Sequence, residues 1–382
     1  MAFDGLTAKS VCNELDCLIG GKITKIFEPN KNEIILGVYS NSSNYALNIS
    51  IDSSLYRLNL TTYNKPNPQN VLGFCMVLRK HLTNGIIKNI YMNGFERIVY
   101  IDILTKNDLN DLTCKTLVVE LMGKHSNIIL LNGFQTVIDS LRHLNRFDNS
   151  NRDIFPGSKY ASINNHKFEF SKTIEDFSRN IFDCNISPFS LSTAISTIYN
   201  GFSKNNLLAL FDHININDED NSYSNLKVVF DYLSNLTSSL LSGGTNNKLV
   251  EYSLKNKKDY FIASCETQSN LDVNFKLDNF YHQKEISDKF QQYKNLILKL
   301  VLNQISKLKN KIKNIDSKIS ECSNMDEYKL YGELLTSNLY RLSNIPIAEV
   351  SLENYYDKNN LITIPLDSRF SPAQNAKNFF KK

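Results

Sequence analysis

The sequence contains no tryptophan, and its cysteines are few and irregularly spaced. The seven cysteines are odd in number and no two stand at C-x-x-C spacing, which argues against a disulfide framework and against a structural zinc site. They are Cys12, Cys17, Cys75, Cys114, Cys184, Cys265 and Cys322. We expect them to be reduced thiols, mostly in the core of a cytosolic protein, and we expect no metal.

Long hydrophobic runs are also missing. No stretch of about 18 apolar residues occurs, so the sequence predicts no membrane span. The opening residues Met1–Gly5 include no basic leader, and no apolar segment of the secretory type follows them. We therefore expect a cytoplasmic protein without a secretion signal.

What is present favours a globular chain of two or three domains. Hydrophobic residues make up 42% of the 382 residues, and 19 Tyr and 22 Phe supply large apolar side chains. The net charge of +4 is too small to identify a nucleic-acid binder, because such proteins are better recognised by clustered charge than by the total.

The first 170 residues or so alternate between strand and helix patterns. The spacing predicts a helix over residues 7–19, with Thr7 as N-cap and Gly20-Gly21 ending it, and a second helix over 70–83. Strands are predicted at 23–27, 33–38, 45–51, 56–60, 86–91, 97–104, 115–121, 128–131 and 137–141. Short strands so close together predict an α+β domain with a mostly antiparallel sheet.

The middle of the chain changes character. After a loop from Pro156-Gly157 towards His166, residues 172–243 have the pattern of short helices, one of them starting at Ser187-Pro188. Residues 248–280 return to short strands, for example 258–263.

From about residue 283 the pattern predicts one long helix. Its apolar residues, from Ile286 to Ile319, repeat in steps of 4 and 3 with one stutter, as in a coiled coil. Residues 283–320 carry nine lysines against three acidic residues, a net charge of +6. Either this is a solvated coiled-coil face, or it is an arm that lies along a phosphate backbone. Candidate RNA contacts on it are Lys307, Lys309, Lys311 and Lys313.

The last segment predicts a helix over 327–342, a strand over 361–365 and the start of another helix before Lys382. A coiled-coil arm needs a returning partner, and none follows in the sequence. We therefore expect a truncated chain, whose apolar seam pairs with a second molecule or folds back onto residues 326–382.

Several segments carry a specific resemblance. They are Met1-Ala2-Phe3-Asp4-Gly5-Leu6-Thr7, Phe74-Cys75-Met76 with Leu78-Arg79-Lys80-His81, Glu120-Leu121-Met122-Gly123-Lys124-His125-Ser126-Asn127-Ile128, Pro156-Gly157 with Tyr160, and Ile364-Pro365-Leu366-Asp367 with Ser371-Pro372 and Gln374-Asn375-Ala376. Together they resemble the NFACT proteins, the RqcH/NEMF family, whose bacterial members have often been labelled fibronectin-binding protein A-like. The similarity runs from residue 1 to 382.

The resemblance implies three parts: an NFACT-N domain at 1–172, a small helix-hairpin-helix-like domain at 173–281, and a coiled-coil arm with a middle module at 282–382, without the returning helix and the NFACT-R domain. It implies a ribosome-associated quality control factor. Such a protein binds large ribosomal subunits obstructed by peptidyl-tRNA and recruits alanyl-tRNA, so that stalled peptides receive alanine tails. The ribosome makes the bonds, so the resemblance implies neither an enzyme nor a cofactor.

The family has an Asp-Arg pair linked to tRNA recognition, and the matching positions here are Glu96-Arg97. The alternative is an exposed ion pair at a strand start. If strands 97–104 and 115–121 form a hairpin with residue 104 opposite about 115, Arg97 lies opposite about Met122. That would bring Glu96-Arg97 and Glu120-Leu121-Met122 to one end of the sheet.

Two further groups are candidate RNA contacts. Lys124 and His125, in the Gly-Lys-His-Ser-Asn segment, either contact tRNA or merely close a turn. Arg79 and Lys80 project from the second helix, where they contact RNA or favour the C-terminal end of the helix dipole.

Two rival functions account for parts of the sequence. The layout is similar to that of formamidopyrimidine-type DNA glycosylases, but residue 2 is Ala2 in place of the proline nucleophile, and zinc-finger cysteines are absent. The other rival is a fibronectin-binding surface adhesin, which would need export.

Overall fold

The structure is a computed structural model that describes residues 3–107, 110–144, 152–163, 167–184, 188–254, 257–265, 271–342, 347–358 and 360–381. The chain divides into two compact units, Met1–Ile286 and Ser287–Lys382. The division at residue 172 within the first unit stays a prediction.

The first unit is built on one large antiparallel sheet, as the strand spacing predicts. Its nine strands lie in the order β4-β3-β2-β1-β5-β6-β7-β8-β9. Their bounds are β1 Lys22–Asn30, β2 Glu33–Ser40, β3 Ser43–Ser50, β4 Arg57–Leu60, β5 Ile86–Met92, β6 Ile98–Lys106, β7 Leu112–Glu120, β8 Asn127–Leu131 and β9 Val137–Ser140. Inward and outward side chains alternate along them, because successive side chains of a strand point to opposite faces.

Two helices accompany the sheet, in agreement with the prediction. Helix α1 (Gly5–Glu14) continues into the short 3-10 helix η1 (Leu15–Leu18), and α2 spans Gly73–Leu82. The predicted N-cap of α1 is wrong: Asp4 caps the helix, and its Oδ1 accepts from the Thr7 amide at 3.0 Å. Gly5 inside the first turn hides this start, because glycine disfavours helix interiors.

Both faces of the sheet are covered. The main core lies under α1 and α2 and is continuous with the helical part of the unit. A smaller core on the other face gathers Ile98, Val118, Ile129 and Ile154, with Tyr160 packed against it. The sheet therefore has no bare face in the part of the chain that the structure describes.

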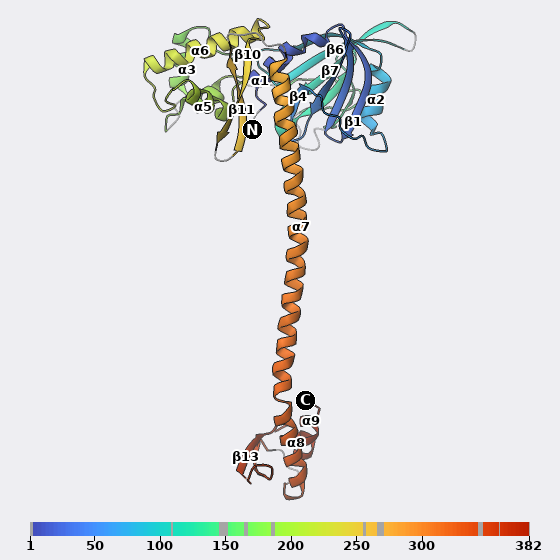
Figure 1. Cartoon of the computed structure of the whole chain (residues 1–382), viewed down its shortest axis with the longest axis vertical. Coiled ribbons are helices and arrows are strands. Elements are labelled where there is room, and N and C mark those ends of the chain that lie inside the picture. The colour runs from blue at the N-terminus through green and yellow to red at the C-terminus, as the bar shows by residue number, and fades with distance from the viewer. Residues whose placement is uncertain are drawn as a thin grey trace. The chain divides into compact units, whose positions relative to one another are not determined.

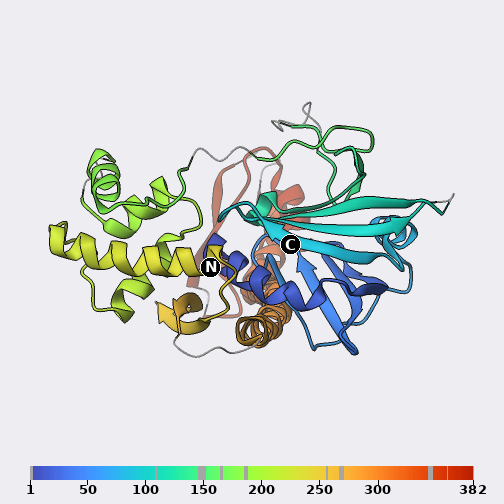
Figure 2. The same ribbon diagram turned by 90° about the horizontal axis from the view of Figure 1, so that it is seen from above.

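The helical part follows the sheet in the chain. Its helices are α3 Ile174–Asp183, α4 Leu191–Ile198, α5 Lys204–His213 and α6 Tyr223–Leu241, followed by the hairpin β10 Asn247–Leu254 and β11 Lys257–Ser264. Helix α4 is capped by Ser190, so the predicted start at Ser187-Pro188 is wrong, and Ser187 itself lies outside the described residues. Figures 1 and 2 show α3–α6 on one side of α1 and the large sheet on the other.

The long helix α7 spans Asp272–Ser323 and begins eleven residues before the predicted start at 283. The predicted strands over 248–280 therefore end too late. The residues before the predicted start, 272–282, form the first turns of α7, which we call its root. Several of them are buried in the first unit, among them Val273, Leu277 and Tyr281.

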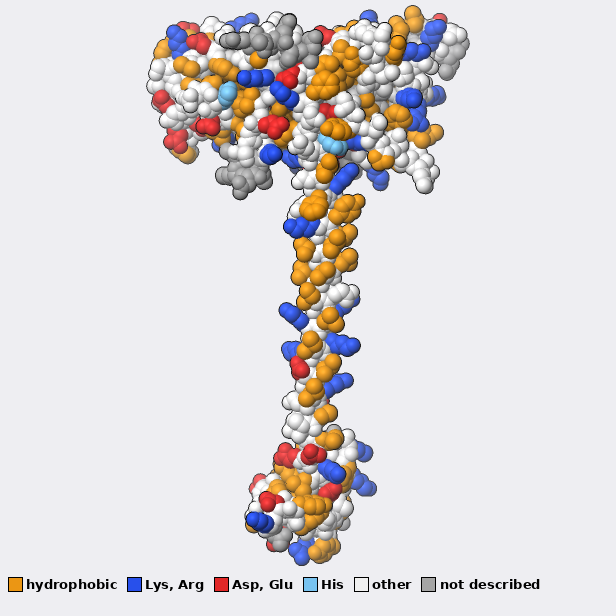
Figure 3. All heavy atoms as spheres, viewed as in Figure 1, with side chains coloured by type: hydrophobic (Ala, Val, Ile, Leu, Met, Phe, Trp, Pro, Cys, Tyr) orange, Lys and Arg blue, Asp and Glu red, His pale blue; other side chains and the backbone are white. Residues whose placement is uncertain are grey.

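The second unit contains the rest of α7, helix α8 (Met325–Asn338), the hairpin β12 Glu349–Asn354 and β13 Asn360–Pro365, and helix α9 (Pro372–Phe379). A small core around Leu334, Leu335 and Ile364 holds the last four together. Strand β12 is absent from the prediction. Among the described residues the seam from Ile286 to Ile319 stays exposed, so the prediction that it folds back onto 326–382 is wrong. Figure 3 shows the apolar side chains along this stretch, with lysines between them.

Candidate functional site

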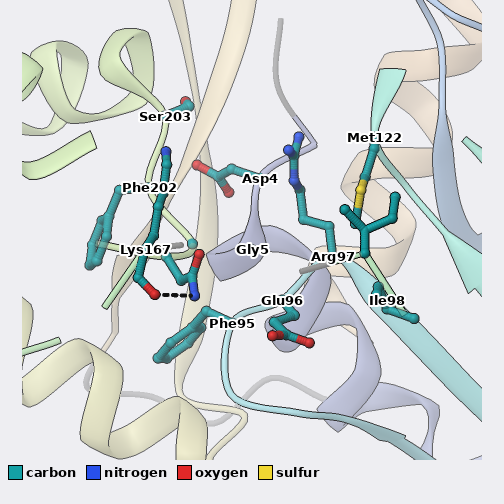
Figure 4. A pocket seen from close by; sticks show the side chains of 13 residues that line it. Asp4, Gly5, Phe95, Glu96, Arg97, Ile98, Met122, Lys167, Phe202 and Ser203 are labelled. Carbon is teal, nitrogen blue, oxygen red and sulfur yellow. Dashed lines mark hydrogen bonds between the residues drawn. The ribbon is translucent and has the colours of Figure 1, made fainter. Parts of the chain in front are cut away.

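A small polar cavity of about 100 Å³ lies in the first unit where the sheet meets the helical part. Five segments line it: the start of α1, the residues entering β6, the residues leaving β7, Ile163 with Lys167, and the turn at 200–203 after α4. Figure 4 shows Arg97 and Lys167 reaching towards Asp4 at this place. Two cations and one carboxylate therefore converge from segments far apart in the sequence.

Backbone geometry brings these segments close together. Gly201 adopts a φ of +94°, and its carbonyl accepts from the Gly5 amide at 3.0 Å. A Cβ added at Gly201 would lie 2.6 Å from Cβ of Phe95, so no larger residue fits without a shift. The Lys167 carbonyl accepts from Asn200 Nδ2 at 3.2 Å, which fixes the strand-like segment that carries the lysine.

The electrostatics of the cavity are mixed. Burial raises the pKa of Asp4, against the lowering effect of hydrogen bonds from Thr7 and Asn206. Burial lowers the pKa of Lys167, and the neighbouring Arg97 cation lowers it further. The Arg97 cation also acts on the Tyr56 phenol: burial raises the pKa of Tyr56, and the neighbouring guanidinium partly offsets that rise. The Lys167 Nζ already donates to the Ser196 carbonyl at 2.5 Å, and the Asp4 carboxylate already accepts from Thr7 and Asn206. A group that enters this cavity therefore meets the Arg97 guanidinium and the remaining N–H groups of Lys167.

Glu96 and Arg97 do not act as a pair. Both are half-buried, but Figure 4 shows the Glu96 carboxylate pointing away from the Arg97 guanidinium. Successive residues of an extended segment point to opposite sides, which accounts for the divergence. Of the two, Arg97 alone is placed to present its donors to the interior of the cavity.

The predicted hairpin forms, one residue out of the expected register. Leu104 lies opposite Cys114 and Ile98 opposite Glu120, so Arg97 faces Leu121, whose amide donates to the Arg97 carbonyl at 2.8 Å. Glu96-Arg97 and Glu120-Leu121-Met122 therefore lie at one end of the sheet. The side chains of Arg97 and Glu120 belong to opposite faces, because each strand alternates.

Glu120 is fully buried and already bonded within the protein. Arg152 Nη1 donates to its Oε1 at 2.7 Å, and Arg152 Nη2 donates to its Oε2. The Tyr160 hydroxyl donates to Oε1 at 2.9 Å, and burial together with the Glu120 charge raises the pKa of Tyr160. Leu121 is buried in the main core. Glu120 and Leu121 therefore support this end of the sheet from inside, whereas Met122 lines the cavity.

The Gly-Lys-His-Ser-Asn segment forms a tight turn, the 3-10 helix η2 (Gly123–His125). Gly123 has a φ of +62°, a conformation that favours glycine. Arg142 holds the turn from below: its Nη1 donates to the carbonyls of Lys124 and Ser126 at 3.1 and 3.3 Å. Ser126 is buried, while Lys124 and His125 are exposed, so the turn presents two side chains that can reach a ligand.

The predicted basic residues on α2 lie elsewhere. Arg79 Nε donates to the Ile26 carbonyl at 2.9 Å, which ties part of its guanidinium to the sheet, and Lys80 is exposed. They belong to the end of the sheet where β6 finishes and β7 begins, since α2 packs beside that region and Lys115 Nζ donates to the His81 carbonyl at 3.3 Å. The structure does not bring Arg79 and Lys80 together with Arg97.

The lysines predicted on the arm belong to the second unit. Lys307, Lys309, Lys311 and Lys313 are all exposed on α7, where apolar side chains alternate with them. Because residues four apart share a side of a helix, Lys307 and Lys311 lie on one side of α7, and Lys309 and Lys313 lie on another.

Sequence reasoning missed Lys167, Tyr56 and Arg142. Each reaches the site through tertiary packing, and none stands in a pattern that spacing could reveal. In the described ranges no group of three or more His, Cys, Asp or Glu side chains is placed to hold a metal ion. Nor does any described helix combine the length and apolar character needed to cross a bilayer.

Comparison with known proteins places this geometry in a family. The family described as NFACT N-terminal and middle domains matches residues 4–382. The chain is 32% identical over 404 residues to the Rqc2 homolog RqcH of Bacillus subtilis and 30% identical over 391 residues to that of Streptococcus suis. In both cases all of this chain is covered, and it spans 66% of the relative's length.

Solved structures agree with the fold. The N-terminal part of the fibronectin/fibrinogen-binding protein of Streptococcus suis superposes with a TM-score of 0.56 at 28% identity, and covers 74% of this chain and 100% of its own. The fibrinogen-binding protein of Staphylococcus aureus gives a TM-score of 0.57 at 28% identity, covering 74% of this chain and 99% of its own. With nearly every residue matched, and the sheet, helices and arm in the expected order, this chain belongs to the NFACT family, the family of the RqcH proteins.

Proposed function

We propose that this chain is part of a ribosome-associated quality control factor, which binds large ribosomal subunits obstructed by peptidyl-tRNA and recruits tRNA for C-terminal tailing of the stalled peptide. Alanyl-tRNA is the proposed cargo. The proposal rests on the Arg97 cavity: a planar guanidinium, a lysine and an exposed Lys124-His125 turn converge at one end of a rigid sheet. A guanidinium offers fixed, planar donors to phosphates and base edges.

In this proposal the chain binds and positions RNA and makes no bonds itself. Arg97 and Lys167 contact the tRNA, Lys124 and His125 contact neighbouring phosphates, and the lysines of α7 contact ribosomal RNA. Glu120 acts indirectly, since its contacts with Arg152 and Tyr160 hold the end of the sheet on which Arg97 stands. The place of action is the cytoplasm, on the ribosome.

Sedimentation tests the proposal. The purified chain is mixed with large ribosomal subunits, with or without peptidyl-tRNA, and the bound small RNA is sequenced. We expect co-sedimentation that depends on peptidyl-tRNA, with one enriched tRNA species that Arg97→Ala removes. Arg179→Ala is the matched control, because Arg179 is an exposed arginine on α3. If Arg97→Ala retains the same tRNA as the control, the cavity is not the tRNA site.

A second candidate function is adhesion to fibronectin or fibrinogen, which the names of the two structural neighbours favour. Cell fractionation separates the two. Enrichment of the chain in the cell-wall fraction, with none on ribosomal subunits, would support adhesion and contradict the ribosomal role.

A further inference from the structure

A second hollow lies on the first unit, away from the Arg97 cavity. Its volume is about 460 Å³, and it is formed where the end of α2 meets the β6–β7 hairpin and the turn between β8 and β9. Three lysines line it, Lys80, Lys106 and Lys115, together with Phe134. The proposed function makes no use of this surface.

The two hollows lie at opposite ends of the same hairpin. Ile98 opposite Glu120 marks the end near Arg97, and Lys106 opposite Leu112 marks the other. Eight residue steps along β6, at about 3.3 Å each, separate these ends by roughly 26 Å. One phosphate cannot contact both, so the second hollow is a site in its own right.

Phe134 is unusual for its exposure. Its side chain is 86% exposed, although burying a phenylalanine side chain away from water would be favourable. The turn that carries it is rigid: Asn132 Oδ1 accepts from the amides of Phe134 and Thr136, both at 2.9 Å. Gln135 follows with a φ of +60°. The ring is thus held out beside the hollow by a fixed backbone.

The charged side chains that line the hollow, in the part of the chain that the structure describes, are basic. Among the described residues that line it, none is acidic. Two carboxylates of the same hairpin, Asp102 and Asp111, carry negative charge but do not line the hollow. Figure 3 shows Lys and Arg side chains on the flank where Figure 1 labels α2, with few acidic ones among them.

We propose that this hollow binds a single-stranded or looped segment of RNA, with one unpaired base stacked on Phe134 and flanking phosphates held by Lys80 and Lys106. The inference rests on the proposed RNA-binding role and adds a second contact to it. An exposed aromatic ring beside lysines is the combination that unpaired nucleotides require, because every base has a flat face and every nucleotide carries a phosphate. A concave surface suits an extruded base better than it suits a lipid bilayer.

Fluorescence anisotropy of a labelled oligouridine RNA of about 12 nucleotides tests the inference with the full chain, between about 50 and 200 mM salt. The variants are Lys80→Ala/Lys106→Ala, Phe134→Ala and Phe134→Tyr. The matched controls are Lys172→Ala/Lys227→Ala, which removes two exposed lysines elsewhere, and Phe182→Ala, which removes a phenylalanine that is 52% exposed on α3. Arg97→Ala is tested beside them.

The lysine double variant should weaken binding and lower the salt slope by about 0.7 for each phosphate that is no longer neutralised. Phe134→Ala should weaken binding roughly 5- to 150-fold at an unchanged slope, and Phe134→Tyr should restore it, because stacking carries little charge. The controls should bind as the original chain does.

Three outcomes would overturn the inference. Wild-type affinity in the hollow variants together with a loss in Arg97→Ala would reject the hollow and keep the proposed function. No RNA binding by any protein, in this assay and in sedimentation, would reject both. Binding of the chain to phosphatidylserine vesicles that needs Lys80 and Lys106, without RNA binding, would assign the hollow to a lipid surface.

Discussion

Replacing Glu120 by glutamine should destabilise the first unit severely without removing an RNA contact. The carboxylate is fully buried, and it accepts hydrogen bonds from Nη1 and Nη2 of Arg152 and from the Tyr160 hydroxyl. A glutamine of the same shape keeps one acceptor but removes the negative charge that both terminal nitrogens of the Arg152 guanidinium contact, and Arg152 is only 14% exposed. Loss of one partner of a buried ion pair costs about 3–5 kcal/mol.

Urea unfolding followed by circular dichroism measures this cost. A loss of about 3–5 kcal/mol lowers the folding equilibrium constant by roughly two to four orders of magnitude. With an m value of about 3 kcal/mol/M, the midpoint should fall by about 1 to 2 M. Arg97→Ala is the comparison, because Arg97 is half-buried and lines a cavity; its free energy of unfolding should change by less than about 1 kcal/mol.

A double variant sharpens the test. Glu120→Leu with Arg152→Met removes both charges, and replacing a buried pair by apolar residues is often close to neutral. Its midpoint should therefore recover most of what Glu120→Gln loses. The reasoning fails if Glu120→Gln unfolds at the wild-type midpoint and yet releases tRNA in the sedimentation assay, since Glu120 would then be an RNA contact and not a support.

Three further predictions concern other parts of the chain. Gly201→Ala should lower the free energy of unfolding by about 1–3 kcal/mol, because its φ is +94° and its Cβ would meet a side-chain carbon at 2.6 Å; Gly243→Ala, with a positive φ but open space, should cost less in the same urea titration. Burial alone would raise the pKa of Glu285, but two neighbouring cations outweigh it and hold that pKa below its usual value. The stability that the Glu285 charge contributes is therefore complete above the ordinary glutamate pKa of about 4.3 and is lost as the pH falls through the lower pKa of the folded state. The difference in urea midpoint between the original chain and Glu285→Gln should accordingly narrow as the pH falls below about 4.3. A difference that stays constant from about pH 7 to 3 would contradict this. Ile305→Lys/Ile312→Lys should abolish concentration-dependent self-association in light scattering, and a chain that is monomeric at every concentration would show that the exposed seam does not pair with a second copy.

The sheet is well predicted from the sequence because its strands carry alternating apolar residues between clear turn signals. The root of α7 escapes prediction for the opposite reason. Its inward face includes Asn274 and Asp278, which are buried against polar groups of β4. A search for apolar residues at helical spacing predicts that such polar residues face the solvent. A polar interface between helix and sheet has no signature in an apolar pattern.

The site was only partly predictable. The resemblance pointed to Arg97, and hairpin pairing placed it near Glu120 to within one residue of register. Neither could show that Glu120 turns to the other face and pairs with Arg152, which is 32 residues away in the sequence. Lys167 joins Arg97 only through packing of the helical part on the sheet, a relation that one sequence cannot reveal.

The root of α7 also has a consequence for the sheet itself. Strand β4 is an edge strand, and an uncovered edge offers its backbone groups to strands of other chains. Here the Leu60 amide donates to Asn274 Oδ1 at 2.9 Å, and the Thr62 amide just beyond β4 donates to Asp278 Oδ2 at 2.8 Å.

The opposite edge is covered too, since the Val137 amide of β9 donates to the Ser158 carbonyl at 2.8 Å. Side chains at one border and a loop at the other thus occupy backbone groups that would otherwise recruit a tenth strand. A sheet protected in this way offers strands of other polypeptides little backbone with which to pair at either edge.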